Sequence, residues 1–347
     1  MFFAFYSHSL CNGVYQGAFI VKTNLLLVST VASQREIILL AIVSPGQGSQ
    51  SVGMLQPWLN DQQNLDLLNT WSQSIGIELS QLGQYGSAED IKSTEIAQPL
   101  IFSCSILSSL GLNIETFKKQ KVIFAGHSVG EFAAYALAGV FNFPDAIKLV
   151  SARGKAMKAA AELTPQTGMS AVLGGNKDFV ISFLKELDLT PANINSEGQI
   201  IAAGKIDKLE ELKLNPPTGT KVIPLNVDAA FHTSYMRPAI SEFKEVFNDI
   251  EIRFPEQLIL TNKNGEFVKE KSDIVENLVN QIISPVRWDL CQKQFISNGV
   301  TGMLELSPGG TLTGIAKKGA PEIETYALKT PADIDIAKEF IRKHIEY

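Results

Sequence analysis

The sequence predicts an α/β protein in which a large domain carries a small inserted subdomain. Two unbroken apolar runs, residues 37–43 and 122–125, are typical of strands that are covered on both faces of a parallel sheet. Between residues 164 and 228 the predicted elements are shorter and follow the order β-α-β-β-α-β. Because 45% of the 347 residues are hydrophobic, the chain can fill a core for both parts.

Composition and charge argue against several classes of function. The formal net charge of -6 gives no reason to expect nucleic acid as the main partner, since that would call for a basic face. The cysteines Cys11, Cys104 and Cys291 form no CxxC pair, so neither a disulfide framework nor a zinc site is predicted. No apolar stretch reaches the roughly 20 residues that a membrane-spanning helix needs, so we expect no membrane segment. Idle thiols are typical of a reducing compartment, and we expect a cytoplasmic protein.

The first 36 residues differ from the rest of the chain. Residues 1–35 hold no Asp or Glu, and their only full charges are Lys22 and Arg35. A signal peptide needs basic residues before its apolar run and small residues at a cleavage site, and this segment matches that pattern poorly. We interpret residues 1–36 as an extension outside the fold.

The strand at residues 37–43 opens the large domain. It ends in the loop at 45–50, where a proline and two glycines stop the strand. The second strand, at 122–125, runs directly into a tight turn and then into a helix of small residues. Another helix follows Pro144, because the fixed φ of proline suits a first helical turn.

The elements between residues 164 and 228 form the predicted insertion. They are strands at 169–173, 192–195, 199–203 and 221–227, and helices at 177–187 and 205–213. This order is the ferredoxin-like arrangement. We therefore expect the insertion to divide the large domain into residues 37–163 and 229–347, the second of which contains further strands near 258–261 and 302–306.

One turn carries the signature of a nucleophile. The sequence Gly126-His127-Ser128-Val129-Gly130 matches G-x-S-x-G, in which a tight strand-to-helix turn lifts a serine hydroxyl out of the backbone. Both glycines are needed because a Cβ at either place clashes across so close a turn. The motif also arises by chance, but here an apolar strand precedes it and a helix follows. We favour a nucleophilic serine over a structural turn that happens to contain one.

A serine nucleophile needs a base, and histidine is the usual base near neutral pH. Of the four histidines, His8 lies in the extension and His344 in a charged tail. His127 adjoins the serine on a turn where neighbouring side chains diverge. His232 remains as the candidate by elimination, although a lone histidine is more often a core residue satisfied by the backbone.

A tetrahedral intermediate also needs two N–H donors aimed at its oxyanion. The amide of Val129 is one candidate, because it lies at the N-terminus of the helix after the turn, where the helix dipole favours negative charge. The glycine-rich loop at 45–48 is a candidate source of the second donor, because glycines let a backbone approach closely. Most such loops are merely turns, so this loop alone is a weak signal.

Six motifs occur in the order and rough spacing of one known family. They are Pro45-Gly46-Gln47-Gly48-Ser49-Gln50, Ala97-Gln98-Pro99, Gly126-His127-Ser128-Val129-Gly130-Glu131, Arg153-Gly154, Ala230-Phe231-His232 and Ser307-Pro308-Gly309-Gly310-Thr311-Leu312-Thr313-Gly314. Through them, about residues 40–329 of the chain resemble the bacterial malonyl-CoA:acyl carrier protein transacylases. The resemblance implies an α/β-hydrolase-like core with an inserted ferredoxin-like subdomain.

The resemblance also implies roles for single residues. By position, Ser128 matches the acylated nucleophile and His232 its base. Gln47 and Val129 match the oxyanion donors through their backbone amides. In this family a backbone carbonyl orients the histidine in place of an aspartate, and Gln281 occupies that position.

Two further positions concern the substrate. Arg153 matches the family arginine that grips the free carboxylate of malonyl, and a guanidinium can pair with a carboxylate through two parallel hydrogen bonds. Without the resemblance, a solvated arginine on a surface helix is the usual state. Phe231 matches a position that varies with acyl-group size, where a bulky ring favours malonyl over methylmalonyl. Plain core packing is the alternative for this phenylalanine.

The implied activity is transfer of malonyl from malonyl-CoA to the phosphopantetheine thiol of acyl carrier protein, for fatty-acid synthesis. It is a ping-pong mechanism through a malonyl-serine, without cofactor or metal. An acyl hydrolase and a polyketide-associated acyltransferase of the same fold stay open as alternatives. So does a non-catalytic carrier-binding scaffold, which leaves the matched site residues unexplained.

The implied partner is acidic in this family, so docking implies basic residues near the cleft. The candidates are Lys155, Lys158, Lys317 and Lys318, although exposed lysines are usually only solvated. We expect neither a nucleic acid nor a membrane partner, and we expect a monomer.

Overall fold

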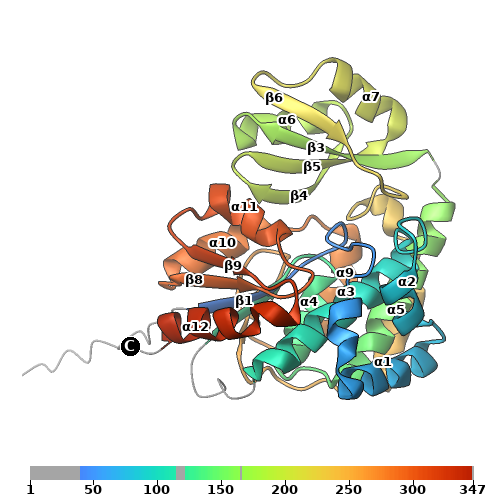
Figure 1. The fold of residues 1–347 in the computed structure, drawn as a ribbon. Helices are drawn as coiled ribbons and strands as arrows, with labels where there is room; N and C mark the ends of the chain where they lie inside the picture. Colours follow the sequence, from blue (N-terminus) through green and yellow to red (C-terminus); the bar gives the residue numbers. More distant parts are fainter. Residues whose placement is uncertain (1–39, 115–121, 165, 346–347) are drawn as a thin grey trace, which may run out of the picture. The chain divides into compact units, whose positions relative to one another are not determined.

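The computed structural model describes residues 40–114, 122–164 and 166–345 of the chain. The interpretation of residues 1–36 as an extension concerns residues outside this range, as do residues 37–39 of the predicted first strand. The described residues contain a five-stranded sheet and a four-stranded sheet (Figure 1). The mixed α/β class predicted from the sequence is therefore confirmed.

The five-stranded sheet is parallel throughout. Its strands are β1 (Leu40–Ser44), β2 (Val122–Gly126), β7 (Leu258–Ile259), β8 (Gly302–Glu305) and β9 (Glu324–Ala327), in the order β7-β2-β1-β8-β9. Ser44 pairs with Gly126, so β1 and β2 end side by side. The loops that follow these two strands therefore meet at one edge of the sheet, where open α/β sheets form their binding sites.

Helices cover both faces of the parallel sheet, as the unbroken apolar runs predict. Leu40 and Ile42 pack into one hydrophobic cluster, and Ala41 and Val43 pack into another. The first cluster draws on α1 (Gln62–Ile75), α3 (Thr94–Leu112), α4 (Gly130–Leu137), α5 (Phe143–Glu162), α8 (Ala239–Val246), α9 (Lys271–Asn280) and α12 (Ile334–Ile345). The second draws on α10 (Trp288–Ser297) and α11 (Thr311–Gly319).

Short elements complete the parallel-sheet core. They are the helix α2 (Leu79–Tyr85) and the 3-10 helices η1 (Gln56–Asn60), η3 (Ser234–Met236), η4 (Phe247–Asp249), η5 (Gln281–Ile283) and η6 (Pro331–Asp333). One longer helix, α3, is apolar and long enough to cross a membrane by length and composition alone. Most of α3 is buried inside the structure. A core helix can have this length and composition, so α3 does not contradict the expectation that the chain lacks a membrane segment.

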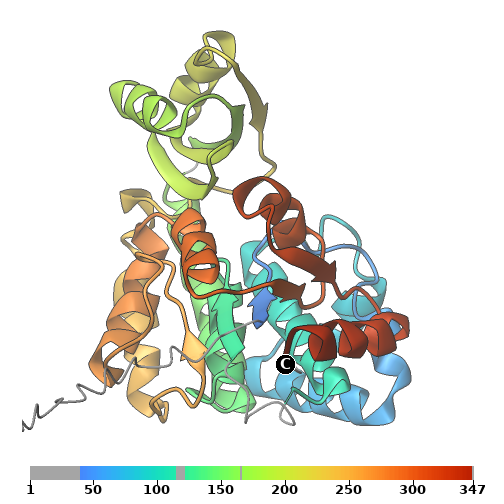
Figure 2. The ribbon, with the colours of Figure 1, turned by 90° about the vertical axis from the view of Figure 1, so that its left-hand side faces the viewer.

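The four-stranded sheet, with the two helices on it, forms what we call the antiparallel unit. Its strands are β3 (Thr167–Gly174), β4 (Thr190–Ser196), β5 (Gln199–Lys205) and β6 (Thr220–Pro224), in the order β4-β5-β3-β6, and its helices are α6 (Lys177–Glu186) and α7 (Ile206–Leu214). The elements follow each other in the predicted β-α-β-β-α-β order. Figures 1 and 2 show both helices on the sheet face that points away from the core.

Strand alternation explains why this sheet has two different faces. On β5, Ile200 and Ala202 pack beneath the helices, whereas Ile201 and Ala203 point to the other side and join the main core. Backbone hydrogen bonds tie β4 to the core. The N–H of Ile194 donates to the Val286 carbonyl over 2.9 Å, and the N–H of Val286 donates to the Ala192 carbonyl over 2.9 Å.

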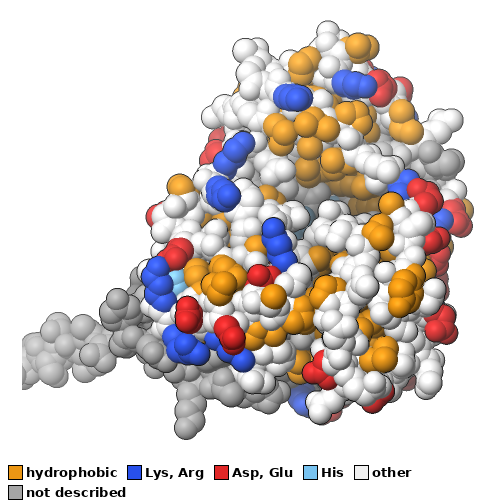
Figure 3. Space-filling model, viewed as in Figure 1, with side chains coloured by type: hydrophobic (Ala, Val, Ile, Leu, Met, Phe, Trp, Pro, Cys, Tyr) orange, Lys and Arg blue, Asp and Glu red, His pale blue; other side chains and the backbone are white. Residues whose placement is uncertain are grey.

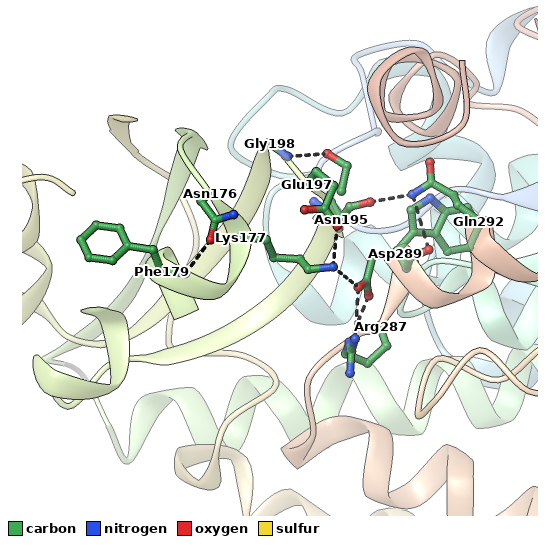
Figure 4. A network of polar contacts seen from close by, with 11 residues as sticks. Asn176, Lys177, Phe179, Asn195, Glu197, Gly198, Arg287, Asp289 and Gln292 are labelled. Carbon is green, nitrogen blue, oxygen red and sulfur yellow. Dashed lines mark hydrogen bonds and ion pairs between the residues drawn. The ribbon is translucent and has the colours of Figure 1, made fainter. Parts of the chain in front are cut away.

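A polar cluster reinforces this junction (Figure 4). The ammonium of Lys177 at the start of α6 lies 2.6 Å from a Glu197 oxygen and 3.5 Å from an Asp289 oxygen. Arg287 approaches the same aspartate, with its Nε 3.0 Å from Oδ1. The side-chain amide of Gln292 donates to the Asn195 carbonyl over 2.6 Å. The antiparallel unit is thus held to α10 by ionic and neutral contacts together.

Candidate active site

The turn after β2 has the tight geometry that the G-x-S-x-G motif predicts. A Cβ on Gly126 would lie 2.0 Å from the backbone of Gly130, and a Cβ on Gly130 would lie 2.2 Å from the carbonyl of Ser44. Ser128 has a φ of 55°, in the left-handed region that residues other than glycine rarely adopt. The predicted need for both glycines is confirmed.

Asn262, just after β7, holds this turn from both sides. Its Oδ1 accepts from the Ser128 N–H over 2.8 Å, and its Nδ2 donates to the Gly126 carbonyl over 2.7 Å. The serine is therefore kept in its strained conformation by a side chain 134 residues further along the chain. The predicted strand near residues 258–261 ends directly before this asparagine, but nothing in the sequence indicates that its side chain reaches the turn around Ser128.

The two residues proposed as nucleophile and base touch each other. Ser128 Oγ lies 2.8 Å from His232 Nε2, and His232 Nδ1 lies 2.8 Å from the backbone carbonyl oxygen of Gln281. A carbonyl only accepts, so Nδ1 carries the proton and Nε2 is left as the acceptor for the serine hydroxyl. The structure thus brings together the three residues that the sequence matched to the family.

Burial and a nearby cation keep this histidine neutral. Burial, and then the charge of Arg153, lower the pKa of His232 to about 3. At neutral pH the imidazole is therefore available to take a proton. Its second nitrogen faces the backbone carbonyl of Gln281, which orients the ring without the negative charge of a carboxylate.

Arg153, on α5, lies at the same place and is fully buried. Its Nη2 donates to Ser128 Oγ over 3.2 Å and to the side-chain oxygen of Gln281 over 2.6 Å, and its Nη1 donates to the side-chain oxygen of Gln98 over 2.7 Å. The guanidinium also lies over the Phe132 ring, 5.7 Å from its centroid. Burial lowers the pKa of Arg153 to about 9, so the group stays charged at neutral pH. The alternative of a solvated surface arginine is wrong.

The serine opens into a cleft of about 500 Å³ between the parallel-sheet core and the antiparallel unit. Figure 3 shows this hollow, with apolar side chains on the wall beneath the antiparallel sheet. That wall includes Met169, Ile201 and Leu225. Gln47 and Phe231 also line the cleft, and the ring of Phe231 is largely buried.

Residues 42–337 match the family described as the acyl transferase domain. This chain belongs to that family. It is 43% identical over 298 residues to the malonyl CoA-acyl carrier protein transacylase of Mycobacterium tuberculosis, which covers 86% of this chain and 98% of that relative. The Bacillus subtilis protein of the same name is 32% identical over 315 residues, which cover 88% of this chain and 98% of that relative.

Solved structures give the same result. A crystal structure of MCAT from Mycobacterium tuberculosis has a TM-score of 0.83 at 42% identity and covers 86% of this chain and 99% of that one. Another structure, described as a type II PKS acyl-carrier protein in complex with its malonyl-transacylase, has a TM-score of 0.79 at 29% identity and covers 87% and 99%. The arrangement of elements is thus that of malonyl transacylase structures.

The remaining predicted residues differ in how they lie relative to the cleft. Val129 directly precedes α4 and is buried. Lys318 lines the cleft, and Lys317 beside it is exposed. Lys155 is directed elsewhere, because its ammonium donates to the Ile75 carbonyl over 3.1 Å. Lys158, the fourth candidate for docking, pairs with a glutamate on its own helix.

Proposed function

We propose that this protein transfers malonyl from malonyl-CoA to the thiol of acyl carrier protein through a malonyl ester on Ser128. One observation carries the proposal: the serine oxygen lies 2.8 Å from His232 Nε2 and 3.2 Å from Arg153 Nη2. A base and a carboxylate-binding cation therefore meet at one hydroxyl. The names of the relatives support malonyl transfer in particular.

In the first half-reaction the serine oxygen attacks the thioester carbonyl of malonyl-CoA, and its proton passes to His232 Nε2. The backbone N–H groups of Gln47 and Val129 stabilise the negative charge that develops on the carbonyl oxygen by donating hydrogen bonds to it. The carbon–sulfur bond then breaks, and the departing thiolate of coenzyme A takes the proton from the imidazole. The Gln281 carbonyl holds the ring in the required tautomer throughout.

In the second half-reaction the thiol of the carrier takes the place of coenzyme A. His232 accepts the thiol proton, and the sulfur attacks the ester carbonyl. The carbon–oxygen bond breaks, and Ser128 recovers its proton from the imidazole. The carrier leaves as a malonyl thioester, and the enzyme returns to its starting state.

Arg153 gives the reaction its preference for malonyl. Its guanidinium is fully buried and is directly bonded to neutral amides, so a malonyl carboxylate can pair with it. An acetyl group does not supply that anion. The cation then stays buried and unpaired, which makes the acetyl complex less stable than the malonyl complex by several kcal/mol. Phe231 beside the base restricts the space for a branched acyl group, which supports malonyl over methylmalonyl.

The same proposal includes finer features of the fold and its setting. The core, residues 37–163 and 229–347, is α/β-hydrolase-like, and residues 164–228 form a ferredoxin-like subdomain. Support comes from the strand-turn-helix around the serine and from the antiparallel order β4-β5-β3-β6. Lys317 and Lys318 at the cleft serve the acidic carrier. A monomeric cytoplasmic enzyme of fatty-acid synthesis remains our prediction.

The test is to trap the covalent intermediate. After brief mixing with malonyl-CoA, mass spectrometry of the digested protein should find one malonyl group on the peptide that contains Ser128. Ser128→Ala should carry no label. Label on any other side chain would refute the assignment.

A second assay separates transfer from hydrolysis. Loaded enzyme is offered holo acyl carrier protein or buffer alone, and the appearance of malonyl-carrier is compared with the release of malonate. We expect transfer to dominate. Equal release into water with and without carrier would favour the hydrolase alternative.

A further inference from the structure

A buried carboxylate lies directly beneath the site. Glu131, three residues after the nucleophile on the first turn of α4, is almost fully buried. One of its oxygens accepts from the backbone N–H of Asn262 over 2.9 Å, and the other accepts from the side-chain amide nitrogen of Gln281. Asn262 clamps the strained turn, so one carboxylate joins that clamp to the residue that orients the base.

Gln281 is the point at which these contacts meet. Its side-chain nitrogen donates to Glu131 and to the Ser128 carbonyl, the latter over 3.0 Å, and its side-chain oxygen accepts from Arg153 over 2.6 Å. Its backbone carbonyl accepts from His232. Any change in the direction of this amide therefore reaches the arginine.

An amide side chain can be turned by 180° with little change in shape, exchanging its donor and its acceptor. In the reversed orientation the NH₂ group of Gln281 would face the guanidinium, donor against donor, and its oxygen would face the Ser128 carbonyl. An ionised carboxylate has only acceptors. Glu131 can therefore receive the NH₂ group and cannot receive the oxygen, so it strengthens the orientation that the guanidinium and the Ser128 carbonyl also favour.

We propose that Glu131 is a positioning residue, whose carboxylate fixes the side-chain amide of Gln281 and through it holds the guanidinium of Arg153 for the acyl carboxylate. This role rests on the malonyl transfer proposed above and concerns the choice between acyl groups. Gln281 lies between Glu131 and the arginine, so Glu131 acts on the site through that amide and not by touching the reacting atoms.

The ionisation of Glu131 gives a second readout. Burial raises its pKa to about 7, against which the Asn262 and Gln281 hydrogen bonds and the charge of Arg153 act. Among the residues that the structure describes, Tyr135 on its own helix and Cys291 on α10, both buried, also interact with it. A protonated carboxyl carries a donor, as glutamine does, so it no longer excludes the reversed amide.

The experiment compares kcat/KM for malonyl-CoA and acetyl-CoA in the wild type and in Glu131→Gln. We expect the malonyl preference to fall about tenfold or more, mainly through KM for malonyl-CoA, because the variant leaves one buried donor without an acceptor. The wild-type preference should also fall as pH decreases through about 7. In the variant, the malonyl preference should be low and should not change with pH over that interval. A wild-type preference and pH profile in the variant would overturn the proposal.

Glu305→Gln is the matched control. Glu305 is a second fully buried carboxylate, and it accepts from the backbone N–H groups of Gly310, Leu312 and Thr313 instead of serving the arginine. This variant should lose thermal stability and keep the malonyl preference. An equal loss of preference in both variants would mean that a general loosening of the fold explains the effect, against the proposal.

A double-mutant cycle identifies the route of the effect. Gln281→Met removes the amide, so adding Glu131→Gln to it should cause no further loss of preference. If the fold losses of malonyl preference in the two single variants multiply in the double variant, Glu131 acts by another route. If Glu131→Gln does not fold, Glu131→Asp replaces it, because aspartate keeps the acceptors and should retain most of the preference. Failure of the wild type to label Ser128 would instead refute the underlying function.

Discussion

Two clusters of buried charge in this protein differ in what surrounds the charge. Beneath the cleft, the cation Arg153 is bonded to the oxygens of two neutral amides, Gln98 and Gln281. At the junction with the antiparallel unit, the side chain of Asp289 is 4% exposed and lies between two cations, Lys177 and Arg287. In the first cluster the direct partners of the cation are dipoles, and the carboxylate of Glu131 acts on it across Gln281; in the second the anion is neutralised directly.

The difference indicates different uses. Dipoles hold a guanidinium in place without cancelling its charge, so an incoming carboxylate still gains most of the attraction. A carboxylate already paired with two cations has little left to offer a ligand, and its contacts join two parts of the fold. Buried charge alone therefore does not indicate a binding site. The chemical nature of the partners distinguishes binding from structural support.

Removing the cation beneath the cleft should have the largest effect on activity. Arg153→Met is expected to lower kcat/KM for malonyl-CoA on the order of 10³-fold, because the acyl carboxylate loses a charged bidentate partner in a buried site. The free energy of unfolding should change by less than about 2 kcal/mol, since an apolar side chain of similar length fills the space. Steady-state kinetics and urea unfolding measure the two effects.

The same variant makes a prediction for pH. The charge of Arg153 is one cause of the lowered pKa of His232, so removing it should raise that pKa toward its usual value. If His232 is the base as proposed, it works in its neutral form, so as the pH is lowered the acetyl-CoA activity of the variant should begin to fall at a higher pH than that of the wild type. If the fall of activity at low pH is unchanged in the variant, burial alone sets the pKa of His232.

Giving the arginine a carboxylate should make the first cluster resemble the second. In Gln98→Glu the new anion lies where an amide oxygen is now 2.7 Å from the guanidinium, and it competes with the acyl carboxylate. We expect KM for malonyl-CoA to rise roughly 10- to 100-fold, with a much smaller change for acetyl-CoA. Gln98→Met, which removes the acceptor without adding charge, is the control. Equal effects of the two variants would mean that loss of the acceptor, and not the added charge, raises KM.

Much of the serine site could be predicted from the sequence because its signals are local. The turn around Ser128 is defined by two glycines within five residues, and an apolar strand precedes it. His232 followed from elimination, since only four histidines were available. The order of elements in the antiparallel unit was also predictable, although β6 ends at Pro224, earlier than the predicted strand.

Contacts between distant segments could not be predicted in the same way. Asn262 and Glu131 act through neighbours that only the folded chain brings close, and neither lies in a pattern that indicates its partner. Arg153 has an ordinary helical sequence around it, so its burial emerges only when α3 and η5 pack over it. The aspartate cluster at the junction depends in the same way on α6 meeting α10.

Breaking that second cluster should affect stability and leave acyl preference unchanged. Asp289→Asn keeps the shape but removes the charge between Lys177 and Arg287. Both cations are partly exposed and can turn toward water, so we expect a loss of about 1–2 kcal/mol, or a melting temperature lower by a few degrees. The ratio of malonyl to acetyl activity should stay within about twofold. A shift in that ratio would mean that the junction also affects how Arg153 is held.

The smallest effect should come from the outer member of the junction. Glu197 lies 2.6 Å from Lys177, but its side chain is 67% exposed, so water and salt screen the pair. Glu197→Gln is expected to cost less than about 0.5 kcal/mol in urea unfolding at low salt. The difference should vanish at high ionic strength, whereas the effect of Asp289→Asn should persist there because its side chain is buried. Equal salt dependence of the two variants would contradict the separation of buried from exposed charge on which the comparison rests.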